Sequence, residues 1–98
     1  MDEFGLDVVH GVRGVLRGMG VYHAPWVIEI SRTGSNTVKA LAYWNPTATP
    51  PRGLPIPTET IQFVQDADHQ IEKFRDVNIV AIASALRRRF ARMFATKG

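Results

Sequence analysis

Residues 26–44 read WVIEISRTGSNTVKALAYW, and this stretch decides the fold. Apolar and polar residues alternate over residues 26–32, and a matching alternation follows over residues 37–44. A period of two is typical of a half-buried β-strand, because successive side chains point to opposite faces of a sheet. Residues 33–36, Thr-Gly-Ser-Asn, form a short link rich in residues that favour turns and tolerate positive φ. The pattern predicts an antiparallel hairpin whose two strands pair in register.

A helix is predicted before the hairpin, over residues 2–19. Apolar side chains recur there at spacings of three and four, at Phe4, Val8, Val12, Val15, Leu16 and Met19. That spacing marks one face of an amphipathic helix. Gly11, Gly14 and Gly18 lie inside it, each at a cost of roughly 1 kcal/mol relative to alanine, so tertiary packing must stabilise this helix. The three glycines share one flank, where another backbone can come close, and Gly20 is suited to end the helix.

The segment after the hairpin is rich in proline. Residues 45–57 hold five of the six prolines and are predicted to form an extended crossover, since proline fits neither a helix interior nor a central strand. A third strand is predicted over residues 58–64, with Ile61 and Phe63 on one face. Residues 66–76 fit two alternatives: a fourth strand over residues 70–75, which we favour, or a helix capped by Asp66.

A second amphipathic helix is predicted at the end of the chain. Its apolar stripe comprises Ile79, Ile82, Ala83, Leu86, Phe90, Met93 and Phe94. Asn78 is a good N-cap, and Val77 and Ile82 have the spacing of a hydrophobic staple. Residues 1–98 are thus expected to form a single α+β domain. It has an N-terminal helix, a small antiparallel sheet of three or four strands and a C-terminal amphipathic basic helix.

Charge is distributed unevenly along the chain. Residues 77–98 contain five basic residues and no acidic one, whereas residues 1–76 carry a net charge of −2, and the sequence pI is about 9.8. This asymmetry points to an anionic partner. On a helical wheel Arg88 and Arg92 fall opposite the apolar stripe, Arg89 falls beside them, and Arg87 lies at the edge of the stripe. Arginine suits phosphate because its planar guanidinium donates two parallel hydrogen bonds.

The first helix offers a second basic strip, formed by His10, Arg13 and Arg17 on its polar face. Arg13 and Arg17 support the predicted binding site, and the two strips would merge if the helices pack suitably. We therefore expect a small non-enzymatic binding module that contacts an anionic macromolecule, with nucleic acid ranked ahead of an acidic protein surface. The alternative is a protein-interaction module, such as a regulator, inhibitor or assembly subunit. It would dock another protein through the glycine flank, a sheet edge or the proline-rich loop.

Catalytic and metal chemistry have little support in the sequence. There is no cysteine, so disulfides, thiolate metal sites and thiol nucleophiles are excluded. Only Asp66, Asp68 and His69 cluster, and an EF-hand loop beginning at Asp66 fails because Ile71 and Val77 stand where glycine and glutamate are needed. No cofactor, metal site or catalytic group is predicted, and an active site centred on His69 ranks third among the hypotheses.

The remaining expectations concern aromatic residues, location and assembly. Trp26 and Trp44 are expected in the core, whereas Tyr43 is the aromatic residue to check, because it points opposite to Trp44 on its strand and shares a face with Lys39. The proline-rich loop, with Arg52 and Leu54, is expected to be a rigid connector, with a binding loop as the second choice. The N-terminus lacks a signal-peptide pattern and no apolar run is long enough to span a membrane, so we predict a cytoplasmic protein. A homodimer through an open sheet edge is compatible with the sequence.

Overall fold

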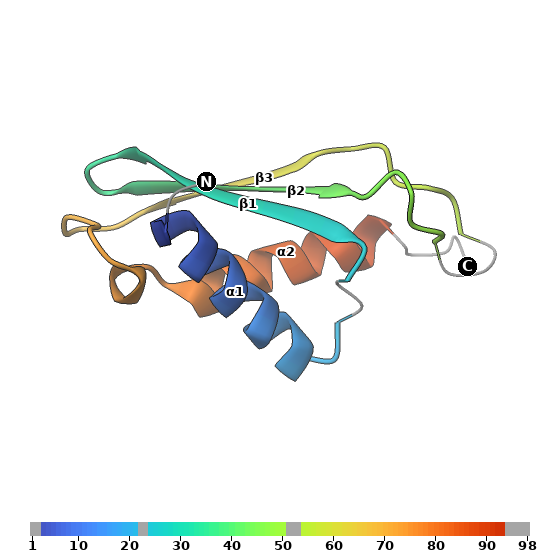
Figure 1. The fold of residues 1–98 in the computed structure, drawn as a ribbon, viewed down its shortest axis with the longest axis horizontal. Coiled ribbons are helices and arrows are strands. Elements are labelled where there is room, and N and C mark those ends of the chain that lie inside the picture. The colour runs from blue at the N-terminus through green and yellow to red at the C-terminus, as the bar shows by residue number, and fades with distance from the viewer. Residues whose placement is uncertain (1–2, 22–23, 51–53, 94–98) are drawn as a thin grey trace.

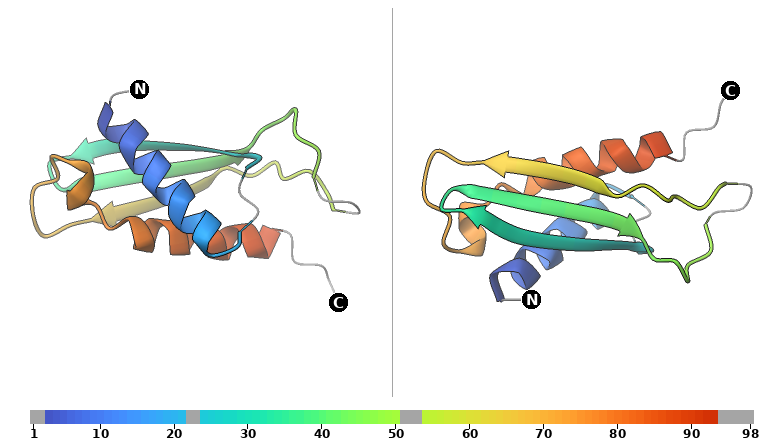
Figure 2. Two further views of the ribbon diagram at one scale, coloured as in Figure 1. Left: turned by 60° about the horizontal axis from the view of Figure 1, so that its bottom comes forward. Right: turned by 90° about the horizontal axis from the view of Figure 1, so that it is seen from above.

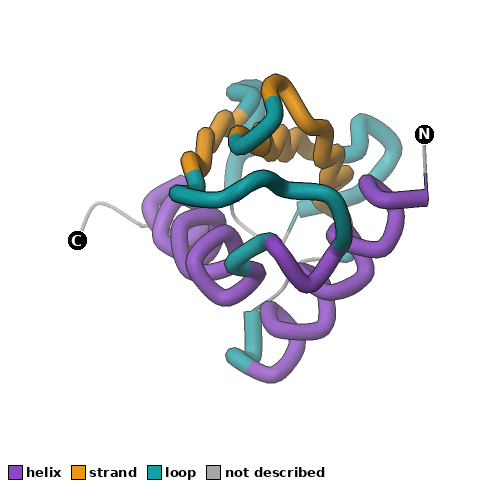
Figure 3. Tube along the Cα trace, turned by 90° about the vertical axis from the view of Figure 1, so that its left-hand side faces the viewer, coloured by secondary structure: helices purple, strands orange, loops and turns teal. Residues whose placement is uncertain are grey.

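The computed structural model describes residues 3–21, 24–50 and 54–93. The elements follow the order α1 (Glu3–Gly18), β1 (Trp26–Gly34), β2 (Thr37–Trp44), β3 (Ile61–Asp66), the short 3-10 helix η1 (Phe74–Asp76) and α2 (Ile79–Met93). The three strands form one antiparallel sheet in the order β1-β2-β3. Both helices lie on the same face of this sheet, so the domain has two layers (Figures 1 and 3). The predicted α+β class, the two terminal helices and the small antiparallel sheet are confirmed.

The predicted hairpin forms in the expected register, from Trp26 opposite Trp44 to Arg32 opposite Val38. It is tighter than predicted, since Gly34 pairs with Thr37 and only two residues remain in the turn. None of the turn residues adopts a positive φ. The pairing is irregular between Arg32 and Gly34, because Thr33 has no partner residue on β2. Such bulges increase the local twist of a strand pair.

The alternation of β2 divides the sheet into two faces. Val38, Ala40, Ala42 and Trp44 are buried against the helices, and the residues between them are half-buried on the open face. An antiparallel sheet commonly has one face on the core and one in water. β3 follows the same alternation: Ile61 is buried, and Phe63, on the same face as predicted, is partly buried. The strand begins at Ile61 and ends at Asp66, later than the predicted residues 58–64.

Trp26 connects the layers of the domain. Its side chain is fully buried, stacks on the Phe90 ring of α2 with centroids 4.3 Å apart, and meets Trp44 edge-on at 5.4 Å. Arg13 of α1 donates a hydrogen bond to the Trp26 backbone carbonyl. One residue at the start of β1 therefore contacts both helices and the neighbouring strand, and the expected core position of both tryptophans is confirmed.

The predicted fourth strand over residues 70–75 is wrong, and so is the alternative helix capped by Asp66. Residues 67–73 instead form a loop that folds back under the hairpin and leads into η1 (Figure 2). The Ile71 amide donates to the Ser35 carbonyl at 2.7 Å, and Ile71 is buried. Asp76 Oδ2 accepts from the amides of Glu72 and Lys73, both at 3.0 Å. The hairpin turn and the Asp76 side chain thus satisfy backbone groups that a fourth strand would have paired with β3.

The start of α2 matches its prediction. Asn78 Oδ1 accepts a hydrogen bond from the Ala81 amide at 3.0 Å, which is the geometry of an N-cap. Val77 and Ile82, the predicted staple pair, are both buried. Phe94, the last residue of the predicted apolar stripe, lies outside the described residues.

The glycine flank of α1 is only partly used. A Cβ on Gly11 would lie 2.7 Å from Cε2 of Phe74 and 2.9 Å from Cδ1 of Ile79, so η1 and α2 approach α1 closely at this residue. A Cβ on Gly14 or Gly18 would meet no atom within 4 Å. A side chain at Gly11 would thus displace Phe74 and Ile79, whereas Gly14 and Gly18 leave room for one.

Gly11→Ala and Gly14→Ala form a matched pair that tests this contact. Gly14→Ala should raise the free energy of unfolding by about 1 kcal/mol, because alanine has the higher helix propensity and space is free. Gly11→Ala forces the Phe74 ring to move, and overpacking of this kind costs about 1–3 kcal/mol. In urea unfolding we expect Gly11→Ala to be the less stable variant by about that amount. Equal stability of the two variants would show that Phe74 does not pack on α1.

Candidate nucleic-acid interface

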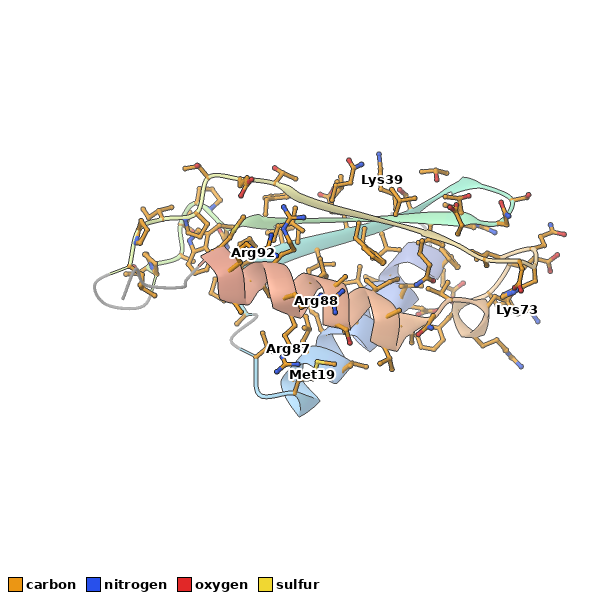
Figure 4. All side chains as sticks on the ribbon, turned by 180° about the vertical axis from the view of Figure 1, so that it is seen from behind. Met19, Lys39, Lys73, Arg87, Arg88 and Arg92 are labelled. Atoms are coloured by element: carbon orange, nitrogen blue, oxygen red, sulfur yellow. The ribbon has the colours of Figure 1, made fainter. Side chains whose placement is uncertain are left out.

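The rotation of α2 about its axis is set by its buried side. Ile82, Leu86 and Phe90 are almost fully buried, and the stack of Phe90 on Trp26 fixes the last turns of the helix against the sheet. Arg88 and Arg92 are exposed on the opposite side (Figure 4). They lie four residues apart, so they are neighbours on one flank. The core contacts of α2 thus hold two arginines outward on a rigid element.

Arg87 and Arg89 differ from the wheel prediction in their exposure. Arg87, expected at the edge of the apolar stripe, is exposed and projects from the flank of α2 on the side of α1 (Figure 4). Arg89, expected beside Arg88 and Arg92, is half-buried. We therefore define the arginine face of α2 as Arg87, Arg88 and Arg92, with Arg89 at its margin.

The arginines of α1 occupy different surroundings. Arg13 is half-buried and donates to the Trp26 carbonyl, and burial lowers the pKa of its guanidinium. This bond places Arg13 on the flank of α1 that faces β1, whereas Arg88 and Arg92 lie on the far side of α2. Arg17 is exposed in the last turn of α1. Arg13 therefore links α1 to the sheet and does not extend the row of Arg88 and Arg92.

Acidic residues gather at the end of the domain away from the C-terminus of α2. They come from the start of α1, the end of β3 and the loop before α2: Glu3, Asp7, Asp66, Asp68, Glu72 and Asp76. These segments lie together at one end of a molecule that is 44 Å long (Figure 1). Among the described residues, no carboxylate forms an ion pair with Arg87, Arg88 or Arg92. The positive charge of the arginine face is therefore not neutralised locally by the described carboxylates.

His69 contacts two residues of the loop before α2 through both nitrogens of its ring, and we call this pair of contacts the His69 clasp. Its Nε2 lies 2.9 Å from the backbone carbonyl of Asp76, and its Nδ1 lies 3.4 Å from Oδ1 of Asp68. Both partners are acceptors, so the doubly protonated ring satisfies both contacts. The bond to the Asp76 carbonyl is the main cause that raises the pKa of His69, and Asp68 adds to it. In the described ranges, no group of three His, Asp or Glu side chains is placed to hold a metal ion.

Other candidate residues are placed as follows. Tyr43 is half-buried on the open face of the sheet, and its hydroxyl donates to Oε2 of Glu29 at 3.0 Å, which raises the pKa of Tyr43. Leu54 is half-buried in the crossover, and Arg52 lies outside the described residues. No described helix is both long and apolar enough to cross a membrane.

Comparison with known proteins does not assign this chain to a family. No family model matches the chain, and no match was found among curated proteins or solved structures.

The His69 clasp makes stability depend on pH. A raised pKa in the folded state means that the folded protein holds the proton more tightly than the unfolded chain, so the contribution is full below pH 6.5 and is lost as the pH rises through the folded pKa. We expect the wild type to lose more stability between pH 6 and pH 8 than His69→Gln, measured by urea unfolding. Parallel profiles for the two proteins would show that the clasp does not form in solution.

Proposed function

We propose that the protein is a small non-enzymatic module that binds nucleic acid through the arginine face of α2. The observation that carries this proposal is the exposure of Arg87, Arg88 and Arg92 on a helix whose other side is locked into the core. A guanidinium stays charged at any relevant pH and donates to phosphate oxygens in a planar fork. Three such groups without a described acidic partner favour contact with a polyanion.

The spacing and shape of the surface support the proposal. Arg88 and Arg92 are separated by one helical turn, or about 6 Å along the axis. Ser84 lies one turn before Arg88 and Ala91 lies beside Arg92, and both are small, so the helix can approach a flat partner closely. Positioning by phosphate contacts carries no sequence information. We therefore propose binding that depends on the backbone of the nucleic acid and weakens steeply with salt.

The segregation of charge supports a preferred orientation. The acidic end lies away from the C-terminal half of α2 (Figure 1). A polyanion attracts the arginine face more than the other end, where Lys73 and Arg75 stand among six acidic residues, and this difference steers the encounter. The domain would then lie on nucleic acid with α2 inward and the loop before η1 outward.

Charge reversal on the arginine face tests the proposal. Arg88→Glu with Arg92→Glu should weaken binding to duplex or single-stranded nucleic acid by more than about tenfold and reduce the salt slope, because about 0.9 counterions are released for each phosphate neutralised on duplex DNA. The melting temperature should change little, since both side chains are exposed. Fluorescence anisotropy at two salt concentrations measures both effects.

Lys73→Glu with Arg75→Glu is the matched control. It makes the same change in net charge at exposed positions near η1, at the other end of the domain (Figure 4). We expect binding to fall only slightly in this variant. An equal loss in both double variants would mean that net charge alone governs binding, and no binding by the wild type at low salt would refute the proposal.

A further inference from the structure

The outer edge of β3 is an unprotected strand edge. β3 ends the sheet order, and among the described residues no segment pairs with its outer side. Natural sheets usually protect such edges with charges, proline or a bulge. Residues 61–65 read IQFVQ and contain none of these, and Val64 is 47% exposed. This edge is therefore open to pairing with another strand.

The opposite edge of the sheet is less available. β1 carries the irregularity between Arg32 and Gly34 and exposes charge at Glu29 and Arg32. α1 packs against this strand, and Arg13 already binds the Trp26 carbonyl. β3 is thus the edge that is better suited to a partner strand.

The hydrogen bonds of the sheet identify which backbone groups of β3 point outward. The Ala67 amide donates to the Asn36 carbonyl at 2.8 Å, directly beyond the last residue pair of β2 and β3. The direction of the backbone groups alternates along an antiparallel ladder, so the odd-numbered residues of β3 bond to β2. The even-numbered residues, Gln62, Val64 and Asp66, turn their amides and carbonyls outward, and their side chains are exposed on the open face.

This edge is complementary to a second copy of itself. A twofold axis through Val64 pairs two β3 strands antiparallel, with Val64 opposite its symmetry mate and Gln62 opposite Asp66 of the other copy. An exposed apolar side chain then meets an identical one, and a carboxamide donates to a carboxylate. Moving the register by two residues would instead set Val64 opposite Gln62 or Asp66. The alternation of polar and apolar residues therefore selects one register.

We propose that the protein forms a homodimer through antiparallel pairing of two β3 edges about this axis. The outward groups of the two copies form about six backbone hydrogen bonds, and the two sheets become one continuous sheet. Both helices of each copy lie on the same face of its sheet (Figure 1), so a twofold axis perpendicular to the sheet keeps all helices on one side. This assembly lies beyond the proposed function.

α2 runs beside β3 in the opposite direction. At one end Gln65 accepts from the Asn78 amide at 3.1 Å and donates to the Asn78 carbonyl at 3.2 Å. At the other end Met93 lines a hollow with residues 55–59. The last turns of α2, which carry three exposed or half-buried arginines after residue 87, therefore lie level with the start of β3, where Glu59 is the acidic residue. This end of the edge is basic on balance.

The other end of β3 is acidic beside its free edge. Asp66 and Asp68 line a hollow with His69, between the end of β3 and the start of α2. Lys73 and Arg75 line a different hollow, with residues from the first turns of α1. Antiparallel pairing sets the arginine end of each copy beside the Asp66 and Asp68 end of the other. Charge thus favours a second copy at both ends of the paired strands.

Two other occupants fit the edge less well. An extended peptide forms the backbone bonds, but it needs a particular sequence to match the side chains and the charge at both ends. A second copy carries every matching group, because the interface is formed by the same surface twice. A nucleic acid offers phosphate acceptors, which leave the outward carbonyls of β3 unpaired.

Val64→Glu and Ser31→Glu are matched variants that test the axis. Both positions are exposed on the open face and pair with Lys39 in the sheet, so each new carboxylate has the same cation opposite it within one copy. Only Val64→Glu sets two carboxylates against each other at the twofold axis. In sedimentation equilibrium at about 100 μM, we expect a wild-type dimer, a Kd raised at least about tenfold in Val64→Glu, and little change in Ser31→Glu.

Hydrogen exchange and one further variant locate the pairing. The amides of Gln62 and Val64 should exchange more slowly as the dimer forms, whereas those of Phe63 and Gln65 bond to β2 and should be slow in monomer and dimer alike. Gln62→Lys places a cation opposite Asp66 of the other copy and should lower the Kd.

Three results would overturn this proposal. A wild type that stays monomeric at about 100 μM would leave the edge to a different strand. Equal weakening by Val64→Glu and Ser31→Glu would attribute the effect to net charge. Unchanged exchange at the amides of Gln62 and Val64 in a dimer would place the contact on another surface. DNA binding is measured in the same two glutamate variants, which have equal charge and an intact arginine face, so the two proposals fail independently.

Discussion

The stack of Phe90 on Trp26 is the interaction on which the arrangement of this domain depends. Trp26 opens β1, directly after the connection from α1, and Phe90 lies in the penultimate turn of α2. Aromatic pairs contribute about 0.5–1.5 kcal/mol beyond the area they bury, and both rings here are almost fully buried. Arg13 and Trp44 contact the same tryptophan. Trp26 thus contacts both helices and the second strand of the hairpin, and these contacts set their relative positions.

This contact connects the core to the surface that is proposed to function. A helix can rotate about its axis unless its buried side is specific, and the flat stack removes that freedom for the last turns of α2. Because Phe90 faces inward, Arg88 and Arg92 face outward and lie one turn apart. The position of the arginine face is therefore a consequence of core packing, and so is the alignment of α2 beside β3.

The other end of the domain is organised by hydrogen bonds. The loop between β3 and α2 is fastened by Ile71 to the hairpin turn, by Asp76 to two amides, and by His69 to the Asp76 carbonyl. These contacts let the chain turn back towards the helices without adding a strand. They leave the outer edge of β3 unpaired by any described segment.

The local patterns of the sequence determined the elements with strong periodicity. The period-two alternation of residues 26–44 sets the hairpin register, since a shift of one residue would turn its apolar side chains to water. The three-four spacing determines both helices, and the excess of arginine after residue 77 identifies the candidate interface. In these cases the information lies within one element, so neighbours along the chain suffice.

Only the tertiary structure decided how those elements meet. Residues 70–75 have weak alternation, and their conformation depends on partners such as Ser35, which lies far away in sequence. Arg13 looked like a surface residue on the helical wheel, yet its position beside β1 gives it a backbone carbonyl to bind. The open edge of β3 and its nearness to α2 have no signal besides the uncharged residues 61–65. Such features depend on the packing of segments distant in the chain. A local sequence pattern does not indicate which surface of an element another segment will cover.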